Sequence, residues 1–145
     1  MSCELYERFA HDVDVPGRYL FCDDRVAVVH VSRGDAGRSY LGHLLVCPRR
    51  HAADFGALDE TECGAVAVEI AKWTRVLKSL GATRVYVATV GHHVDHLHVH
   101  LLPRWPETPS EVQWHAVDEW PGARTDDFAE IAAFVAEIVA AQREG

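Results

Sequence analysis

Short stretches of β-prone residues recur through the first two thirds of the chain, and they predict strands of an antiparallel sheet. The runs 18–22 and 25–31 flank an Asp-Asp pair, which predicts a hairpin. Another strand is expected at 42–47. A further run at 84–90 passes through a short connection into a stretch that alternates strictly between polar and apolar residues over 95–102. Such a short connection predicts antiparallel neighbours.

Two other stretches have the three-and-four spacing of apolar residues that is typical of amphipathic helices. The first begins at a capping box of Asp59 and Glu62 and ends before Gly81. Its core-facing positions are Cys63, Val66, Ile70, Trp73, Val76, Leu77 and Leu80, with Glu69, Lys72, Arg75 and Lys78 mostly on the other face. The second has Thr125 as its N-cap and an apolar face of Phe128, Ile131, Phe134, Val135, Ile138 and Val139. These elements predict an α+β fold, with an antiparallel sheet of about five strands and two helices.

No internal repeat, linker or low-complexity tract divides the 145 residues. We therefore expect a single domain over 1–145, with a C-terminal extension over about 105–145 that ends in the second helix. The extension opens at Trp105 and carries Trp114 and Trp120 in an irregular stretch among acids and prolines. Such aromatic side chains on a surface loop need cover.

The formal net charge of −8 argues against a sequence-independent grip on nucleic acid, which needs a basic surface. A small phosphorylated substrate needs only a local positive site, so the acidic total does not exclude one. There is no apolar run long enough to cross a membrane and no signal-peptide pattern, so we expect a cytoplasmic protein without a membrane partner. The four cysteines are far apart in sequence and are expected to be free thiols.

The alternating stretch concentrates the candidate chemistry, because segment 92–100 holds five of the ten histidines. On a strand, Leu97, Val99 and Leu101 would face the core, and the opposite face would carry the histidine row, which we define as His96, His98 and His100. Neighbouring imidazoles of the row would lie about 6.6 Å apart. Three chemistries suit such a row: metal binding, nucleophilic catalysis at phosphorus or an acyl centre, and anion binding. The last two combine naturally, whereas no Cys or Glu nearby completes a zinc site.

The residues around the row resemble a known family. Stretch 96–102 reads His-φ-His-φ-His-φ-φ, where φ is apolar, and resembles the signature of the histidine triad (HIT) superfamily of nucleotide hydrolases and transferases. Segment 41–51 resembles the family's Gly-His-x-Leu-Val-x-Pro-Lys/Arg-x-His sequence. Segment 90–95 resembles its approach to the triad, and 102–104 its exit. The segments follow the family's order, so the similarity covers roughly residues 3–105.

The resemblance implies a HIT-like fold, a homodimer with the two sheets joined, and no cofactor. It implies hydrolysis at the α-phosphorus of a nucleotide, such as a dinucleoside polyphosphate, with release of a nucleoside monophosphate. His98 would attack and form a covalent nucleotidyl-histidine, His96 would orient it, and His100 would bond the phosphoryl oxygens. His51 occupies the place of a histidine that the family often sets near the triad.

Two departures from the family pattern concern substrate binding. The entry to the triad resembles the diadenosine tetraphosphate hydrolase-like subgroup, with His92 in place of a polar amide, so we expect His92 to donate a hydrogen bond to a phosphate oxygen. His93 is expected to be exposed. The ribose-binding Asp of the family is missing, and His30 or Val31 stands in its place. His30 is therefore a candidate substrate contact or, equally, a surface strand residue.

The N-terminal segment 2–17 predicts a short helical turn and then a loop. Many relatives open with a Cys-x-x-Cys pair that helps to hold zinc, but here Tyr6 follows Cys3 at the second position, so no metal is expected. Two other functions stay open beside the hydrolase: a nucleotidyl transferase or phosphoramidase, and a nucleotide-binding sensor with slow turnover. We expect the tryptophans of the extension either to pack under their loop or to complete the site of a neighbouring subunit, as C-terminal segments do in some HIT dimers.

Overall fold

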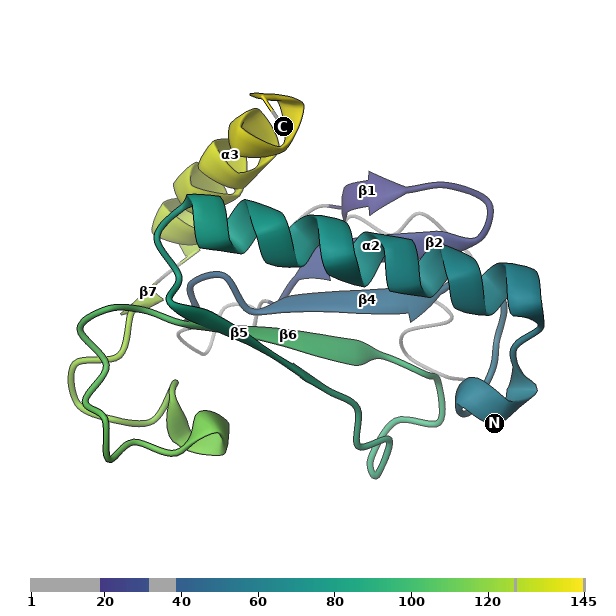
Figure 1. Ribbon diagram of the computed structural model, residues 1–145, viewed down its shortest axis with the longest axis horizontal. Coiled ribbons are helices and arrows are strands. Elements are labelled where there is room, and N and C mark those ends of the chain that lie inside the picture. The colour runs from purple at the N-terminus through teal and green to yellow at the C-terminus, as the bar shows by residue number, and fades with distance from the viewer. Residues whose placement is uncertain (1–18, 32–38, 127, 145) are drawn as a thin grey trace.

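The sheet forms the centre of the computed structural model, which describes residues 19–31, 39–126 and 128–144 (Figure 1). Within these ranges the side chains of 126, 128–132, 135 and 144 lie outside the description. The five strands are β1 (Tyr19–Cys22), β2 (Val26–His30), β4 (Leu44–Pro48), β5 (Arg84–Ala88) and β6 (Val99–Arg104). They lie in the order β1-β2-β4-β6-β5, and every neighbouring pair is antiparallel. The predicted α+β fold is confirmed.

The predicted hairpin joins β1 and β2, and a side chain fixes its turn. The Oδ1 atom of Asp23 accepts hydrogen bonds from the backbone N–H groups of Arg25 and Val26, both at 2.8 Å. An aspartate that bonds the backbone just ahead of it is a common turn device. Val26 and Val28 then face the core from β2, where both are buried.

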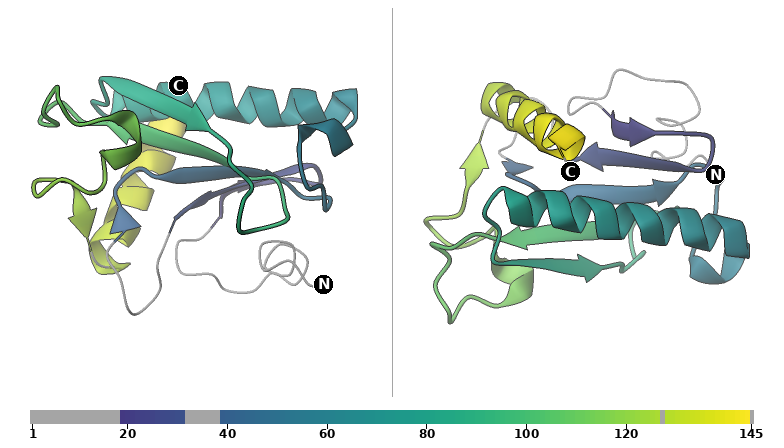
Figure 2. Two further views of the ribbon diagram at one scale, coloured as in Figure 1. Left: turned by 90° about the horizontal axis from the view of Figure 1, so that it is seen from below. Right: turned by 45° about the horizontal axis from the view of Figure 1, so that its top comes forward.

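Helix α2 (Glu60–Ser79) covers one face of the sheet (Figures 1 and 2), and it begins and ends as the sequence predicts. Asp59 accepts a hydrogen bond from the N–H of Glu62 at 2.8 Å, and the carboxylate of Glu62 accepts one from the N–H of Asp59 at 2.9 Å. Past its C-terminus Gly81 takes a φ of +110°. The capping box and the glycine stop are therefore confirmed.

One charged residue of α2 was placed on the wrong face. Glu69 is buried, with 6% of its surface exposed. Its Oε2 accepts a hydrogen bond from Nε1 of Trp73 at 2.8 Å and lies 3.4 Å from Nζ of Lys72. The indole and the ammonium group satisfy the buried carboxylate, so Glu69 belongs to the packed face of the helix.

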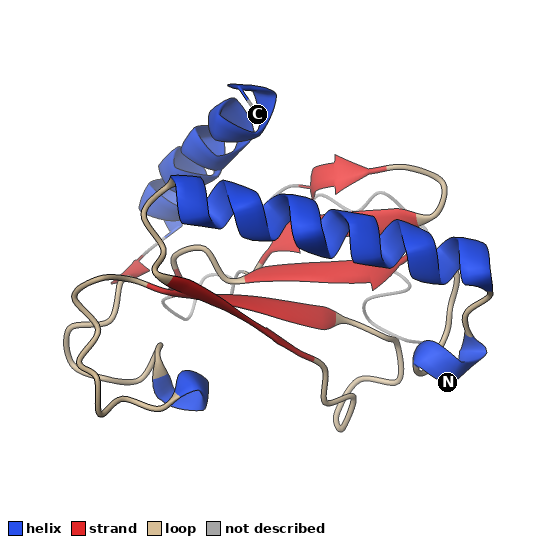
Figure 3. Cartoon of the chain, viewed as in Figure 1, coloured by secondary structure: helices blue, strands red, loops and turns tan. Residues whose placement is uncertain are grey.

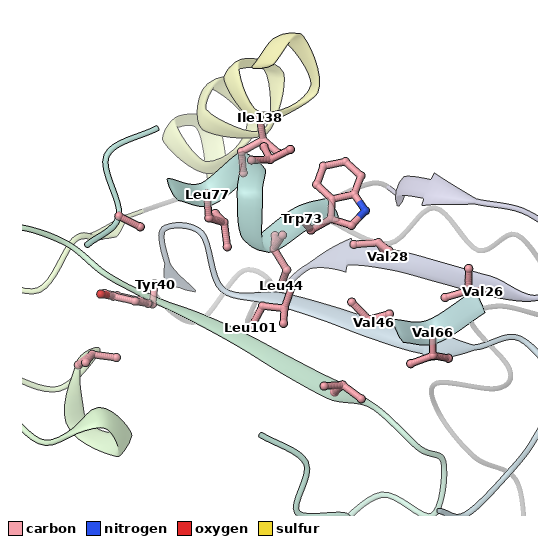
Figure 4. Packing of buried hydrophobic residues seen from close by; sticks show 14 of the residues in the cluster. Val26, Val28, Tyr40, Leu44, Val46, Val66, Trp73, Leu77, Leu101 and Ile138 are labelled. Carbon is pink, nitrogen blue, oxygen red and sulfur yellow. The ribbon is translucent and has the colours of Figure 1, made fainter. Parts of the chain in front are cut away.

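The main core lies between α2 and the sheet, with a contribution from α3 (Phe128–Glu144) (Figure 4). Its largest fully buried residues include Leu44, Leu101, Trp73, Leu77 and Ile138. Trp105 is also buried in this cluster, and its ring meets Phe134 of α3 edge to face at a centroid distance of 5.8 Å. The core therefore joins the extension to the sheet. Among the predicted apolar positions of α3, Phe128, Ile131 and Val135 lie outside the described side chains.

The start of the last helix differs from the prediction. Thr125, expected as the N-cap, lies in strand β7 (Thr125–Asp126), which pairs with β3 (Ser39–Tyr40) in a separate two-stranded sheet. The partner strand is far away in sequence, so local propensity alone did not indicate this pairing. Short 3₁₀ turns at Phe55–Ala57 and Trp114–Ala116 complete the elements of the described residues, as Figure 3 shows.

The remaining predictions about the fold concern the cysteines, membrane-spanning helices and the N-terminal segment. Cys22 and Cys63 are free thiols, as predicted. Within the described ranges no helix is long and apolar enough to cross a membrane. The expected turn at 2–17 and the Cys3 position lie outside the described residues, and the single domain over 1–145 stays a prediction.

Candidate active site

The apolar face of the alternating stretch is as predicted. Leu97, Val99 and Leu101 are all buried, with exposed fractions of 3% or less. His98 and His100 are half-buried on the other face, with ring centroids 5.0 Å apart and an interplanar angle of 69°. Two imidazoles therefore stand close enough to contact one phosphate group.

His96 departs from the expected arrangement because it is fully buried and precedes the strand, which begins at Val99. Its Nε2–H donates to the backbone oxygen of Pro48 at 2.7 Å, and its ring meets His51 edge to face at 5.4 Å. Burial lowers the pKa of His96, the bond to Pro48 opposes that shift, and the neighbouring imidazoles of His51 and His98 add to it. His96 is thus a neutral anchor inside the protein instead of a third imidazole on the accessible face.

The ring of His98 is oriented by the backbone of His96. The Nδ1 atom of His98 lies 2.7 Å from the carbonyl oxygen of His96. A carbonyl oxygen only accepts, so Nδ1 carries the proton and Nε2 of the neutral ring keeps its lone pair. The carbonyl oxygen of His98 accepts in turn from Oγ1 of Thr89 at 2.9 Å. This tautomer presents Nε2 of His98 as a nucleophile.

His100 pairs with a histidine that our prediction from the sequence missed. Its Nδ1 lies 2.8 Å from Nε2 of His43, so one of the two rings donates to the other. Burial, and then the neighbouring His98, lowers the pKa of His100. Leu45 of β4 pairs with His100, and His43, which lies just before β4 and two residues from Leu45, continues the same face, so it comes beside the row. The alternation of the sequence puts His43 and Leu45 on one face, but only the register of β4 against β6 brings that face beside His100.

The loop before the row is longer than the short connection that we predicted. Strand β5 ends at Ala88, and residues 89–98 lie outside the ladder. The backbone N–H of Leu97 bonds the oxygen of Ala52 at 2.7 Å, so this part of the loop is held by the segment after β4. Tertiary bonds of this kind took the place of the expected strand pairing.

The candidate phosphate contact His92 lies in this loop, just after Gly91, whose φ is +65°. His92 and His93 are both exposed, and their rings meet edge to face at a centroid distance of 4.7 Å. The exposure expected of His93 is confirmed. A phosphate contact by His92 stays a prediction, as does the supporting role of the exposed His51.

His30 has a structural setting in place of the substrate contact or surface position that we expected. It is 2% exposed. Its Nδ1–H donates to the oxygen of Val31 at 2.8 Å, and its Nε2 accepts from the N–H of Gly42 at 2.9 Å. Both ring nitrogens are therefore bonded to backbone groups, and the ring lies away from solvent.

The three tryptophans of the extension have different settings. Trp105 is a core residue whose Nε1–H donates to the oxygen of Leu41 at 3.1 Å. The ring of Trp120 lies against Gly122. Trp114 is 44% exposed and lies 6.4 Å from the ring of Tyr86 on β5. Of these three tryptophans, Trp114 has the most surface to offer a ligand or a partner subunit.

Metal binding is the remaining chemistry that was considered for the row. In the part of the chain that the structure describes, no three His, Cys, Asp or Glu side chains gather as they would around an ion. His98, whose ring is held by the carbonyl group of His96, lies beside His100, whose ring is paired with His43.

The HIT domain model matches residues 16–107, so the chain belongs to the HIT domain family. An uncharacterized HIT-like protein of Mycoplasma genitalium is 39% identical over 70 residues, which cover 44% of this chain and 50% of that protein. The chain therefore spans about half the length of this relative.

Two solved structures have the same fold over most of their length. One is a hypothetical histidine triad nucleotide-binding protein of Sulfolobus tokodaii, with a TM-score of 0.70, 17% identity, and 98% of this chain and 93% of that chain covered. The other is a zinc-bound histidine triad family protein of Mycobacterium smegmatis, with a TM-score of 0.70, 20% identity, and coverages of 99% and 97%. At these identities the likeness shows the fold alone.

Proposed function

We propose that this protein is a nucleotide hydrolase that cleaves at the α-phosphorus through a covalent intermediate on His98. Nε2 of His98 attacks phosphorus, a P–N bond forms, and the bond to the leaving oxygen breaks with its electron pair on the leaving group. Water then attacks the same phosphorus, the P–N bond breaks, and a nucleoside monophosphate is released. The substrate class that we propose is a dinucleoside polyphosphate or a similar nucleotide.

The observation that carries this proposal is the bond from Nδ1–H of His98 to the oxygen of His96 at 2.7 Å. It holds the tautomer in which Nε2 is unprotonated, and it restricts rotation of the ring. Because the imidazole is neutral, it can attack without first losing a proton. Because its ring is already oriented, the entropic part of the barrier is lower. His96 thus orients the nucleophile through its carbonyl group, while its own ring anchors the segment to Pro48.

His100 supplies the second part of the chemistry in this proposal. Its ring lies 5.0 Å from that of His98, and Nδ1 is engaged by His43 at 2.8 Å. When His43 is the donor, Nε2 of His100 carries a proton and can donate to a phosphoryl oxygen as negative charge develops there. His92 is proposed to bind a phosphate oxygen farther along the substrate.

The remaining parts of the proposal come from the resemblance and the composition. They are the diadenosine tetraphosphate hydrolase-like subgroup, a homodimer with joined sheets, and a cytoplasmic location. The name of the Sulfolobus neighbour describes that protein as nucleotide-binding, which supports a nucleotide as the ligand here.

A substrate panel tests the function directly. The protein is incubated with dinucleoside polyphosphates, nucleoside phosphoramidates and nucleotide sugars, and nucleoside monophosphate is measured by chromatography. We expect release from the dinucleoside polyphosphates, and loss of that release in His98→Ala with nucleotide binding retained. His93→Ala is the matched control, because this exposed histidine has no part in the proposed chemistry.

Other outcomes of the panel identify other functions. Turnover of phosphoramidates alone would identify a phosphoramidase, and transfer to a second acceptor would identify a transferase. Nucleotide binding without product from any substrate would identify a sensor. Wild-type turnover in His98→Ala would contradict covalent catalysis through this residue.

A further inference from the structure

His30 is a buried titratable side chain that the proposed chemistry does not use. It lies at the end of β2, is 2% exposed, and has both ring nitrogens bonded to backbone groups. Because Nδ1–H donates to a carbonyl oxygen, Nε2 is left as the acceptor for the N–H of Gly42. Only the neutral ring makes both bonds, and burial lowers the pKa of His30, although the bond with Val31 opposes the shift.

Two hydrogen bonds join the last residue of β2, His30, and the following Val31 to the adjacent residues Gly42 and His43. Nε2 of His30 accepts from the N–H of Gly42 at 2.9 Å, and the N–H of Val31 donates to the oxygen of His43 at 2.8 Å. The short segment of Gly42 and His43 is therefore held at its first N–H and at its last carbonyl group. Gly42 has a φ of +87°, so this clamp fixes a backbone conformation that most residues avoid.

The clamped segment contacts the histidine row through the side chain of His43. The side chain of His43 leaves this fixed backbone and meets Nδ1 of His100 at 2.8 Å. A small rotation of the backbone at Gly42 would swing the His43 ring away, and His100 would lose the partner that sets its proton arrangement. Displacements of about 1 Å in such supporting groups can cost on the order of a hundredfold in rate.

We propose that His30 is a positioning residue of the site: as a neutral acceptor for Gly42 it fixes the backbone that holds His43 against His100. The kinetic part of this inference rests on the proposed hydrolase function. His30 touches no substrate in this account, and it acts only through Gly42 and His43.

A double-mutant cycle tests whether His30 acts on the site through His43. His30→Phe keeps a ring in the buried space and removes the acceptor, so kcat should fall about tenfold to a hundredfold with KM nearly unchanged. His30→Gln can place its side-chain oxygen near the Nε2 position and should recover most of that loss. In a His43→Phe background, His30→Phe should cost little more, because the group through which it acts is already gone.

Val28→Ala provides the matched structural control. Val28 lies on the same face of β2, is fully buried, and takes no part in the clamp. The Val28→Ala substitution should lower the free energy of unfolding and leave kcat unchanged at temperatures where the protein is folded. Should His30→Phe fail to fold, His30→Leu, which is smaller and also lacks an acceptor, takes its place in the cycle.

A second readout needs no turnover. The ¹⁵N chemical shifts of the His100 ring report its hydrogen bond to His43, and they should change in His30→Phe and stay unchanged in Val28→Ala. An equal kcat loss from His30→Phe with and without His43, or unchanged His100 shifts, would overturn the inference. If the wild-type protein turns over no nucleotide, the proposed function fails, and the shifts alone then decide the role of His30.

Discussion

Replacing Gly42 by alanine should be among the most damaging single-methyl changes in this protein. Gly42 has a φ of +87°, in the region that side chains with a Cβ rarely adopt. An added Cβ would lie 2.8 Å from Cγ of Pro103, 3.1 Å from the Trp105 ring and 3.2 Å from Leu77. These neighbours are parts of the packed core and have little room to move.

Two costs combine at this position. The left-handed conformation costs an alanine roughly 1–2 kcal/mol. Forcing a methyl group into a packed core costs typically about 1–3 kcal/mol more. We therefore expect Gly42→Ala to lower the free energy of unfolding by about 2–5 kcal/mol.

Two other glycines separate these costs. Gly81 has a φ of +110° with no atom within 4 Å of an added Cβ, so Gly81→Ala carries only the conformational cost. Gly64 lies inside α2 and also has no atom within 4 Å, so Gly64→Ala should stabilise the protein by up to about 1 kcal/mol.

Urea denaturation of the wild type and the three variants measures the series. The expected order of stability is Gly64→Ala above wild type, then Gly81→Ala, then Gly42→Ala. A Gly42→Ala protein no less stable than Gly81→Ala would refute the argument from close packing around Gly42. A fall in turnover should accompany Gly42→Ala under conditions where it is folded, since His43 follows directly.

Further predictions concern pH, metal and a helix cap. The pKa of His30 is lowered in the folded protein, so its stabilising effect is fully present above about pH 6.5 and is lost as pH falls below that value, by up to about 1.4 kcal/mol per pH unit. Denaturation at pH 7 and pH 5 should show this slope, and His30→Gln should reduce it; an equal slope in both proteins would contradict the assignment. Treatment with a chelator should leave the Tm unchanged, because Tyr6 replaces the second cysteine of the zinc pair, and stoichiometric zinc on elemental analysis would reverse that reading. Asp59→Ala removes the N-cap of α2 and should cost about 1 kcal/mol, measured as a lower Tm; no loss would mean that the capping box adds little here.

Features that depend on local bonds were predictable from the sequence. The turn at Asp23 and the capping box of Asp59 and Glu62 both join a side chain to backbone groups two or three residues away. Their residue types and spacing therefore carry the information. The apolar stripe of α2 was predictable for the same reason, since its spacing follows from the helical repeat.

Features that depend on distant partners were not predictable in this way. Glu69 differs in having its partners, Lys72 and Trp73, on the same helix, but its charge indicated a solvent-facing position, and its burial depends on how the helix packs on the sheet. His96 continues the alternation of the row, yet its bond to Pro48 takes it into the interior. Thr125 is of a residue type that is common at helix N-caps, but it pairs with Tyr40 in the two-stranded sheet.

The same division holds for the candidate site. The face shared by His98 and His100 follows from the period of a strand, and it was predicted. The pairing of His43 with His100 depends on the register of β4 against β6, which the sequence does not show. His30 was expected to be a substrate contact or, equally, a surface strand residue, because the resemblance places a ribose-binding residue there. Its bond to Gly42 depends on how the end of β2 meets the segment before β4.

Trapping the covalent intermediate tests the central claim most directly. The protein is mixed with excess dinucleoside polyphosphate, quenched in alkali to preserve the acid-labile P–N bond, digested, and analysed by mass spectrometry. We predict one nucleotidyl group on the peptide that contains His98, its presence in His93→Ala, and its absence in His98→Ala. Turnover of the substrate with no adduct formed, or with the adduct on another residue, would contradict covalent catalysis by His98.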